Sequence, residues 1–165
     1  MATAFVHSIQ IGNGGVPKIA VERAVVGADG LVGDVQRNLK YHGGPRRAVC
    51  LYSLESIEKL QKEGHPIFPG SIGENITISG IEWASLAEKV NLRIGKTVIL
   101  RITSPAKPCS TIAASFHDAN SSRVSHKRHP LDTRWYARVL AGGVVERGDP
   151  VEMITNIKMI QSMLF

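Results

Sequence analysis

Leu92-Arg-Ile-Gly-Lys-Thr-Val-Ile-Leu-Arg-Ile-Thr103 is the stretch of sequence that decides the fold class. Its many β-branched and apolar residues predict a long strand that is entered through a glycine turn at Gly95. Asn75-Ile-Thr-Ile-Ser-Gly80 alternates polar and apolar residues, as a half-buried strand does. Both segments indicate a fold built mainly from short strands.

Working outward, three further segments predict strands. Lys18 to Val26 is rich in β-branched residues, and Arg47 to Tyr52 is a compact apolar run. Residues 135–140 and 144–154 are expected to form a hairpin around Gly142-Gly143.

One clear helix is expected after Ser53, which is a good N-cap residue. Leu54, Ile57 and Leu60 recur at helical spacing until Gly64 ends the run. Residues 110–116 are expected to form one or two helical turns. Many short strands with one helix predict a mainly β (α+β) fold, a small β-barrel with a few short helices.

Length and composition predict one domain. The chain has 165 residues, 43% of them hydrophobic, and no repeat or low-complexity linker divides it. Residues 1–154 are therefore expected to form a single domain. In the apolar tail 155–165, Ile157, Ile160 and Leu164 recur at helical spacing, so this tail is expected to pack on the domain or on a partner subunit.

The compartment and the partner class follow from charge and cysteine usage. Cys50 and Cys109 show no disulfide or zinc spacing, no apolar run reaches the ~20 residues that span a bilayer, and residues 1–12 do not resemble a signal peptide. A cytoplasmic protein without a membrane partner is expected. The net charge of +6 favours anionic ligands, but aromatic residues are 5% of the chain and no nucleic-acid motif is present, so nucleic acid is not expected.

The segment Ser104-Pro-Ala-Lys-Pro-Cys-Ser-Thr111 carries the strongest indication of chemistry. Its prolines rigidify the loop and place Cys109 at the start of a short helix, where backbone N–H groups favour a thiolate. Lys107 adds a nearby cation, while Ser110 and Thr111 can donate hydrogen bonds to an anion. Such a thiolate can ligate a metal, carry a persulfide or attack an electrophile, and the alternative is an inert buried thiol.

The segment Tyr41-His-Gly-Gly-Pro-Arg-Arg47 is a candidate anion-binding loop. Glycine lets backbone N–H groups approach an anion, and arginine binds oxyanions in a forked geometry. A simple turn with a loop histidine is the alternative interpretation. The candidate residues are His42, Gly43, Gly44, Arg46 and Arg47.

Two other polar or reactive residues lie in or next to strands. Asn75 has the donors and the acceptor that suit the edge of a polar heterocycle, although a turn residue is the alternative. Cys50 lies inside an apolar strand and is expected to be a core residue.

Taken in chain order, these segments and several short glycine-containing ones resemble the MOSC domain, which is named for the C-terminal part of molybdenum cofactor sulfurase. The resemblance spans about Ile19 to Met153 and is strongest with the stand-alone bacterial members. It implies a β-barrel similar to the barrel domain of pyruvate kinase. The segments that carry it are Gly33-Asp34, His42-Gly-Gly-Pro45, Arg47-Ala48-Val49, Pro69-Gly-Ser-Ile-Gly-Glu-Asn-Ile76, Gly95, Pro105, Lys107-Pro-Cys109, Gly143 and Gly148-Asp149-Pro-Val151.

The resemblance also implies a function. In members that hold molybdenum cofactor, such as the amidoxime-reducing proteins, the cysteine that matches Cys109 ligates molybdenum, and the asparagine that matches Asn75 contacts the pterin. The expected activity is reduction of small N-hydroxylated compounds by a molybdenum-dependent oxidoreductase. The expected cofactor-binding residues are His42, Gly43, Gly44, Arg46, Arg47, Asn75, Lys107, Ser110 and Thr111.

Two alternatives stay open. Cys109 as a sulfur carrier would accept a persulfide from a pyridoxal-phosphate desulfurase, and a non-catalytic basic binding module would not need Cys109. The chain shows no pyridoxal-phosphate lysine site and no ferredoxin cysteine set, so a desulfurase or an electron-donor protein is the expected partner. It also lacks the separate N-terminal barrel of the amidoxime reducers, and a homodimer is one assembly that stays open.

Overall fold

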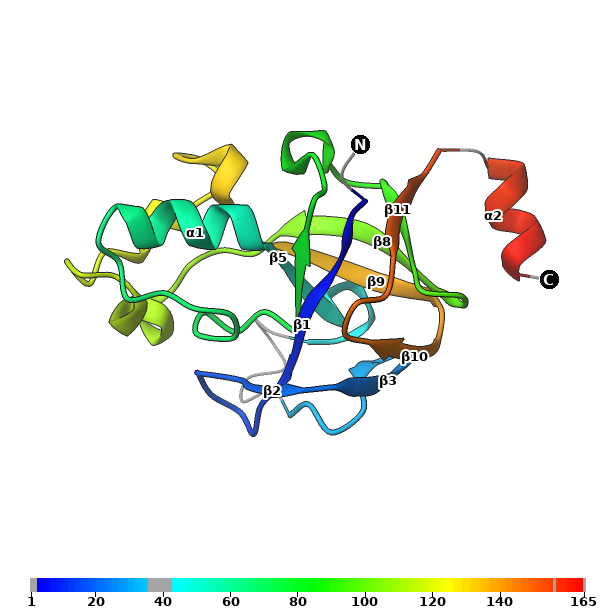
Figure 1. Ribbon diagram of the computed structural model, residues 1–165, viewed down its shortest axis with the longest axis horizontal. Coiled ribbons are helices and arrows are strands. Elements are labelled where there is room, and N and C mark those ends of the chain that lie inside the picture. Colours follow the sequence, from blue (N-terminus) through cyan, green and yellow to red (C-terminus); the bar gives the residue numbers. More distant parts are fainter. Residues whose placement is uncertain (1–2, 36–42, 156, 165) are drawn as a thin grey trace.

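The structure is a computed structural model that describes residues 3–35, 43–155 and 157–164. Within these residues the strands form a large and a small sheet (Figure 1). The large sheet has the order β11-β7-β8-β9-β5-β6-β1-β2, and only its β5–β6 pair is parallel. Its strands are β1 (Phe5–Ile11), β2 (Ile19–Val21), β5 (Val49–Ser53), β6 (Ile76–Ser79), β7 (Asn91–Ile94), β8 (Val98–Pro105), β9 (Trp135–Ala141) and β11 (Val151–Ile154).

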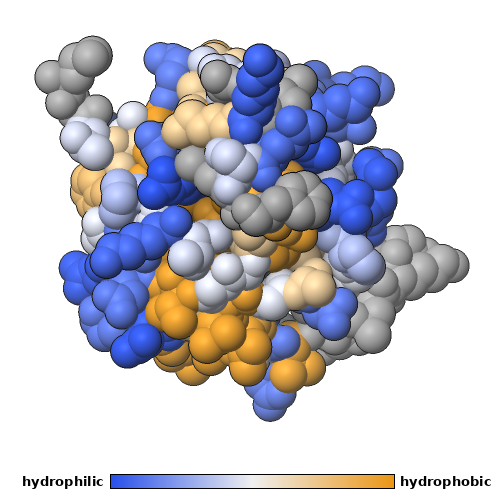
Figure 2. Space-filling model, turned by 90° about the vertical axis from the view of Figure 1, so that its right-hand side faces the viewer, coloured by the Kyte–Doolittle hydropathy of each residue, from blue (hydrophilic) through white to orange (hydrophobic). Residues whose placement is uncertain are grey.

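The small sheet has the order β10-β3-β4 and packs on the large one. Its strands are β3 (Arg23–Gly27), β4 (Gly30–Leu31) and β10 (Gly143–Glu146). Val26 and Val145 point into a core that they share with strands of the large sheet, whereas Val25 and Val144 are exposed on the other face. On the side of the molecule seen in Figure 2, apolar side chains gather below the centre among hydrophilic ones. A homodimer, one assembly that the sequence leaves open, stays untested by this fold.

The mainly β fold is confirmed, but the expected barrel is not closed. The strand ladders end at β2 on one side and at β11 on the other. Between β1 and the residues ahead of β11 there is a single bridge, Phe5 with Pro150, flanked by hydrogen bonds from the Val6 N–H to the Asp149 carbonyl (2.8 Å) and from the Val151 N–H to the Ala4 carbonyl (3.0 Å). These hydrogen bonds lie on both sides of Pro150, and the contact stays a single bridge in place of a strand ladder.

The expected helix is confirmed as α1 (Leu54–Lys62). The Ser53 hydroxyl caps it by accepting the Ser56 N–H at 3.1 Å, and Ile57 and Leu60 are buried. The one or two helical turns expected over residues 110–116 form a 3-10 helix, η3 (Ser110–Ser115). The other 3-10 helices of the described residues are η1 (Pro45–Arg47), η2 (Trp83–Ser85), η4 (Ser121–Val124) and η5 (Pro130–Asp132).

Three strand predictions need correction. The run 92–103 makes two strands, β7 and β8, that pair with each other across the turn at Gly95, and the run 18–26 divides into β2 and β3. The hairpin expected around Gly142-Gly143 is wrong, because β9 pairs with β5 and β8 while β10 pairs with β3. A side chain at Gly142 would come within 2.5 Å of the Val26 carbonyl, so glycine lets the chain cross between sheets there.

The tail forms a helix, α2 (Ile157–Leu164), next to β11 (right in Figure 1). Ile160 is buried, and Met159 is exposed. The expected contact of the tail with a partner subunit stays a prediction. No helix in the described part of the chain is long and apolar enough to cross a membrane.

Gly70 allows the loop ahead of β6 to meet the loop ahead of β2. The Lys18 N–H donates to the Gly70 carbonyl at 2.9 Å, and a Cβ at Gly70 would come within 2.5 Å of the Lys18 carbonyl oxygen. Both Gly70 and Gly148 have a backbone φ of 89°, but a Cβ at Gly148 would meet no atom within 4 Å. The two glycines therefore separate backbone strain from steric overlap.

Gly70→Ala is expected to lower the free energy of unfolding by about 3 kcal/mol, because the left-handed backbone and the overlap with Lys18 both cost energy. Gly148→Ala, the matched control, is expected to lose about 1 kcal/mol from the backbone alone. Urea unfolding of both variants measures the difference. Equal losses would contradict the close approach at Gly70.

Candidate functional site

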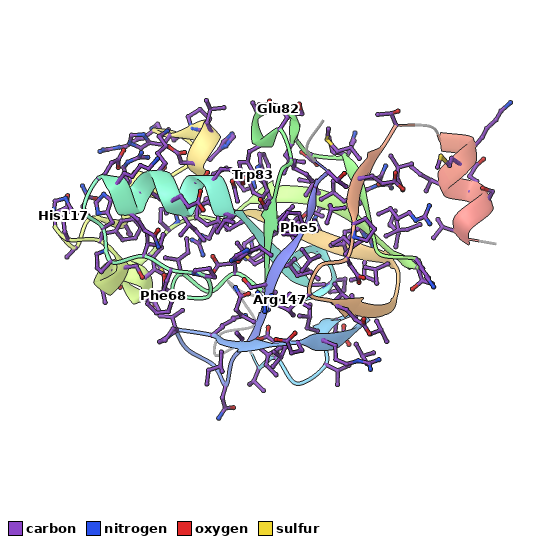
Figure 3. All side chains as sticks on the ribbon, viewed as in Figure 1. Phe5, Phe68, Glu82, Trp83, His117 and Arg147 are labelled. Atoms are coloured by element: carbon purple, nitrogen blue, oxygen red, sulfur yellow. The ribbon has the colours of Figure 1, made fainter. Side chains whose placement is uncertain are left out.

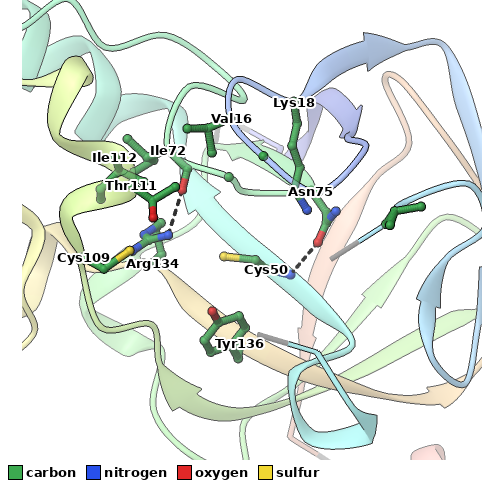
Figure 4. A pocket seen from close by; sticks show the side chains of 14 residues that line it. Val16, Lys18, Cys50, Ile72, Asn75, Cys109, Thr111, Ile112, Arg134 and Tyr136 are labelled. Atoms are coloured by element: carbon green, nitrogen blue, oxygen red, sulfur yellow. Dashed lines mark hydrogen bonds between the residues drawn. The ribbon is translucent and has the colours of Figure 1, made fainter. Parts of the chain in front are cut away.

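Fourteen of the described residues line a pocket of about 340 Å³ (Figure 4). Four separated segments supply most of its wall: the loop between β1 and β2, the residues ahead of β6, the start of η3 and the start of β9. The pocket therefore forms only when the whole sheet is assembled. The lining residues are Gly14, Gly15, Val16, Lys18, Val35, Cys50, Ile72, Gly73, Asn75, Cys109, Thr111, Ile112, Arg134 and Tyr136.

Cys109 lies at the pocket wall, half-buried, between β8 and η3. Its backbone is extended (φ −138°, ψ 175°), so it is the N-cap residue of η3 and not part of the helix. Because η3 is a 3-10 helix of six residues, its dipole is small. The side chain of Thr111, two residues further on, also lines the pocket.

Cys50 lines the same pocket, although the sequence indicated a core residue. It lies on β5 opposite Tyr136 of β9 and is 5% exposed, so it is both buried and next to the cavity. Burial raises the pKa of the Cys50 thiol to about 11. At neutral pH this thiol is therefore protonated and a poor nucleophile.

Arg134 places a buried cation in the wall. The residue is 5% exposed, and its guanidinium donates to the Ile72 carbonyl at 2.7 Å and to the Lys107 carbonyl at 3.4 Å. Its Nε has no hydrogen-bond partner among the described residues. Arg134 thus joins the loop ahead of β6 to the loop that carries Cys109, and it keeps one donor unsatisfied beside the pocket.

A hydrogen-bonded chain forms the opposite wall. Lys18 Nζ lies 2.9 Å from Asp34 Oδ2, and Asn75 Nδ2 donates to the same oxygen at 2.9 Å. Asn75 Oδ1 accepts the backbone N–H of Cys50 at 3.0 Å, and Nδ2 also donates to the Gln10 carbonyl at 3.4 Å. The Asn75 side chain is fully buried, and its amide group makes all of these hydrogen bonds. It therefore connects the backbone of β5 to Asp34. Its contact with a pterin stays a prediction.

The structure brings together part of the predicted site. Cys109, Asn75 and Thr111 share the pocket, whereas Lys107 and Ser110 are exposed outside its lining. The Lys107 carbonyl still takes part, as the acceptor of Arg134.

The 41–47 loop is described only from Gly43 onward, so His42 lies outside the described residues. Gly43 and Gly44 both have positive φ and do not line the pocket. Arg46 reaches Glu88 at the surface (3.9 Å). The guanidinium carbon of Arg47 lies 5.7 Å from the ring centroid of Tyr136, so this residue reaches the pocket through a lining side chain.

Among the lining residues that the sequence did not predict, three have a cationic or hydroxyl side chain: Lys18, Arg134 and Tyr136. The sequence does mark Arg134 as unusual, because it is a charged residue directly ahead of the apolar and aromatic run that forms β9. A cation at the start of a buried strand needs acceptors or a ligand. Lys18 had no comparable signal, because its partner Asp34 is distant in sequence.

Glu74 is a fully buried carboxyl group next to the lining residues Gly73 and Asn75. Its Oε1 accepts the Gly70 N–H at 2.6 Å, and its Oε2 has no partner among the described residues. Burial raises the pKa of Glu74 to about 7, against the opposing effects of Arg134 and of the Gly70 N–H. Near neutral pH this group is therefore only partly ionised.

The family model of the MOSC domain matches residues 38–152. The chain belongs to the MOSC domain family. This family is linked to molybdenum cofactor, and the match includes Cys50, Asn75, Cys109, Arg134 and Tyr136.

Two bacterial relatives are similar in sequence to this MOSC protein. The uncharacterized protein YflK of Bacillus subtilis is 29% identical over 125 residues, and protein YiiM of Escherichia coli is 25% identical over 132 residues. These matches cover 75% and 78% of this chain but 55% and 58% of the relatives, so the chain spans a little over half of their length.

The crystal structure of YiiM from Geobacillus stearothermophilus has the same fold. Its TM-score with this chain is 0.71 at 24% sequence identity, over 92% of this chain and 75% of that one.

The two thiols are predicted to react at very different rates. Iodoacetamide at neutral pH should label Cys109 at least about 100-fold faster than Cys50, because a buried thiol with a pKa of about 11 is ionised to only about one part in ten thousand. Peptide mass mapping after short exposure measures both rates. In Cys109→Ser, Cys50 should stay unlabelled until the protein is denatured, and earlier labelling of Cys50 would refute the assignment.

Glu74→Gln is predicted to stabilise the protein more at high pH than at low pH. The folded-state pKa of Glu74 is raised, so its contribution to stability is complete below about pH 4.5 and is lost as the pH rises to about 7. Glutamine cannot ionise, so the stability of the variant relative to wild type should increase by about 2 kcal/mol between pH 5 and pH 8. Glu58→Gln, on the exposed side of α1, controls for the lost charge in urea unfolding. A pH-independent difference would contradict the prediction.

Proposed function

We propose that this MOSC protein binds molybdenum cofactor in the pocket beside Cys109 and reduces small N-hydroxylated compounds. One observation carries the proposal: a half-buried thiol and a buried arginine with an unsatisfied Nε line the same pocket. The thiol suits a soft metal-binding role, and the guanidinium suits an anionic group. The proposal therefore depends on Cys109 and Arg134 together.

The residues present fit such a group. The volume of about 340 Å³ is within the range of small-molecule sites, at its lower end. Arg134 offers positive charge to a phosphate, and Gly14, Gly15 and Gly73 let the backbone come close to a flat ring. Cys109 would hold the metal through sulfur.

When bound, the cofactor would supply a two-electron redox centre. Reduction of an N-hydroxyl group to an amine and water consumes two electrons and two protons. Burial raises the pKa of Tyr136 to about 12, so its Oη holds a proton at neutral pH and can donate it in a hydrogen bond to the substrate hydroxyl. The electrons would come from a partner protein.

The test is the metal content and activity of the purified protein. Wild type expressed in a host that makes the cofactor is expected to carry molybdenum and pterin, and Cys109→Ser is expected to lose at least about 100-fold in N-hydroxyl reduction, since oxygen is a harder donor than sulfur. Cys50→Ser, which removes the other thiol of the pocket, is expected to keep its molybdenum. Thermal melting of each variant checks the fold. Wild type without molybdenum or pterin would overturn the proposal.

A sulfur carrier is the second candidate, and the partial exposure of Cys109 favours it because a partner's persulfide can reach a thiol that is not enclosed. The Cys109 thiolate would attack the outer sulfur of a desulfurase persulfide. A new S–S bond would form at Cys109, and the desulfurase cysteine would leave as a thiolate. Persulfide on Cys109 without molybdenum would select this function. A silent Cys109→Ser in every assay would instead select a non-catalytic binding module.

A further inference from the structure

A histidine-rich cluster lies at the end of α1, formed by different residues from those that line the pocket. Its members are His65, His117 and Asp118, and one ligand atom of each lies within 4.8 Å of the others. His65 follows α1, and the other two follow η3 (His117 is labelled at the left of Figure 3). The geometry points to a site for a divalent transition metal of the zinc class, held by two imidazole nitrogens and one carboxylate oxygen.

His65 is the fixed member of the cluster. It is 7% exposed, its ring meets Phe116 edge-on with centroids 5.4 Å apart, and it stacks on the His117 ring at 4.6 Å. Gly64 has a positive φ of 95°, which turns the chain at the end of α1 and directs His65 inward. Packing therefore sets the plane of this imidazole before any ion arrives.

The contacts of the His65 ring make Nδ1 the nitrogen that can bind a metal. Its Nδ1 accepts the His117 N–H at 3.3 Å, so Nδ1 carries a lone pair, and its Nε2 faces Glu63 Oε2 at 3.6 Å. Metal-binding histidines commonly direct their second ring nitrogen at a carboxylate in this way. The bond at Nδ1 is long, and the amide that makes it belongs to an exposed residue, so an ion can replace it.

Glu63 is itself held in place. Arg123 donates to its two oxygens at 2.9 and 2.8 Å and also to Asp132 at 2.8 Å. The carboxylate that orients His65 is thus held in place by Arg123 on its other side.

The other two ligands are exposed and can close on an ion. The Asn120 N–H donates to Asp118 Oδ1 at 3.1 Å, which leaves Oδ2 for a metal. Ligand atoms around tetrahedral zinc lie about 3.3 Å apart, so His117 and Asp118 need to move by up to about 1.5 Å. The exposed His117 ring must also turn out of its stack on His65, because an imidazole lone pair lies in the plane of the ring. Two nitrogens and one oxygen are a typical donor set for Zn²⁺, with water as the fourth ligand.

Calorimetric titration with ZnCl2 tests the site. The protein is used without a histidine tag, treated with chelator, and carries Cys109→Ser so that this pocket thiol does not bind zinc. One zinc per chain is expected. Neighbours that orient a metal ligand typically change affinity by about 10- to 100-fold, so Glu63→Gln should weaken binding by about that factor and His117→Ala by at least about 100-fold.

Controls separate this site from other histidines and from unfolding. His126→Ala removes an exposed histidine outside the cluster and should bind zinc as the parent does. His117 and Asp118 are exposed, so His117→Ala and Asp118→Asn should fold normally, whereas the buried His65 is left intact. Zinc at 100-fold excess over its dissociation constant should raise the Tm by about 5 °C, and this shift should vanish in His117→Ala.

The proposal is overturned if the parent takes up no zinc at about 100 µM, or if His117→Ala and Asp118→Asn bind it as tightly as the parent. Loss of binding in His126→Ala alone would also overturn it. Because Cys109→Ser is the parent here, the result does not depend on molybdenum cofactor.

Discussion

The burial of one guanidinium group constrains the whole pocket. Transfer of an arginine cation out of water costs several kcal/mol unless its donors find acceptors. Arg134 finds two backbone carbonyls, at Ile72 and Lys107, which belong to loops 35 residues apart in sequence. Satisfying this charge therefore brings the loop ahead of β6 and the Cys109 loop to one place. Residues of both loops then line the pocket beside Arg134.

The centre of the large sheet supplies the rigid support for these loops. β5 lies between β6 and β9, so its residues hydrogen-bond on both sides, and Cys50 and Tyr136 face each other across the β5–β9 ladder. Asn75 ties the backbone of Cys50 to Asp34, and Asp34 holds Lys18. A network in which each member is satisfied fixes side chains better than isolated contacts do. This explains why the loops can carry reactive groups without an extensive set of helices around them.

Sequence periodicity predicted local structure well and long-range pairing poorly. The cap at Ser53, the helix α1 and the strand β6 follow from residue spacing within ten positions, where local rules apply. The assignment of β9 and β10 to different sheets could not follow from spacing, because it depends on Gly142 meeting the Val26 carbonyl more than one hundred residues away. Strand β1 was not predicted, since its apolar positions are interrupted by a shift in register between Val6 and Ser8.

The same distinction applies to the site. The prolines around Cys109 mark that loop in the sequence itself, and the thiol does lie at a pocket. Nothing local marks Lys18, whose position follows from Asp34. The apolar neighbours of Cys50 predict a core residue, and it is buried, but one side of it also faces the cavity. A buried residue can also line a pocket, and only the assembled fold shows which buried residues do so.

Charge within the pocket links ligand binding to protonation. Lys18 is balanced by Asp34, with which it forms a short ion pair, so it adds little net charge. Arg134 lowers the pKa of Glu74, yet burial outweighs this effect and sets that pKa at about 7. An anion that binds beside Arg134 would offset the guanidinium charge and remove its favourable effect on ionised Glu74. The pKa of Glu74 would then rise further, and by linkage the pocket would take up a proton as the anion binds near neutral pH. This carboxyl group is thus expected to make the affinity fall as the pH rises through 7, for an anion that does not itself titrate in this range.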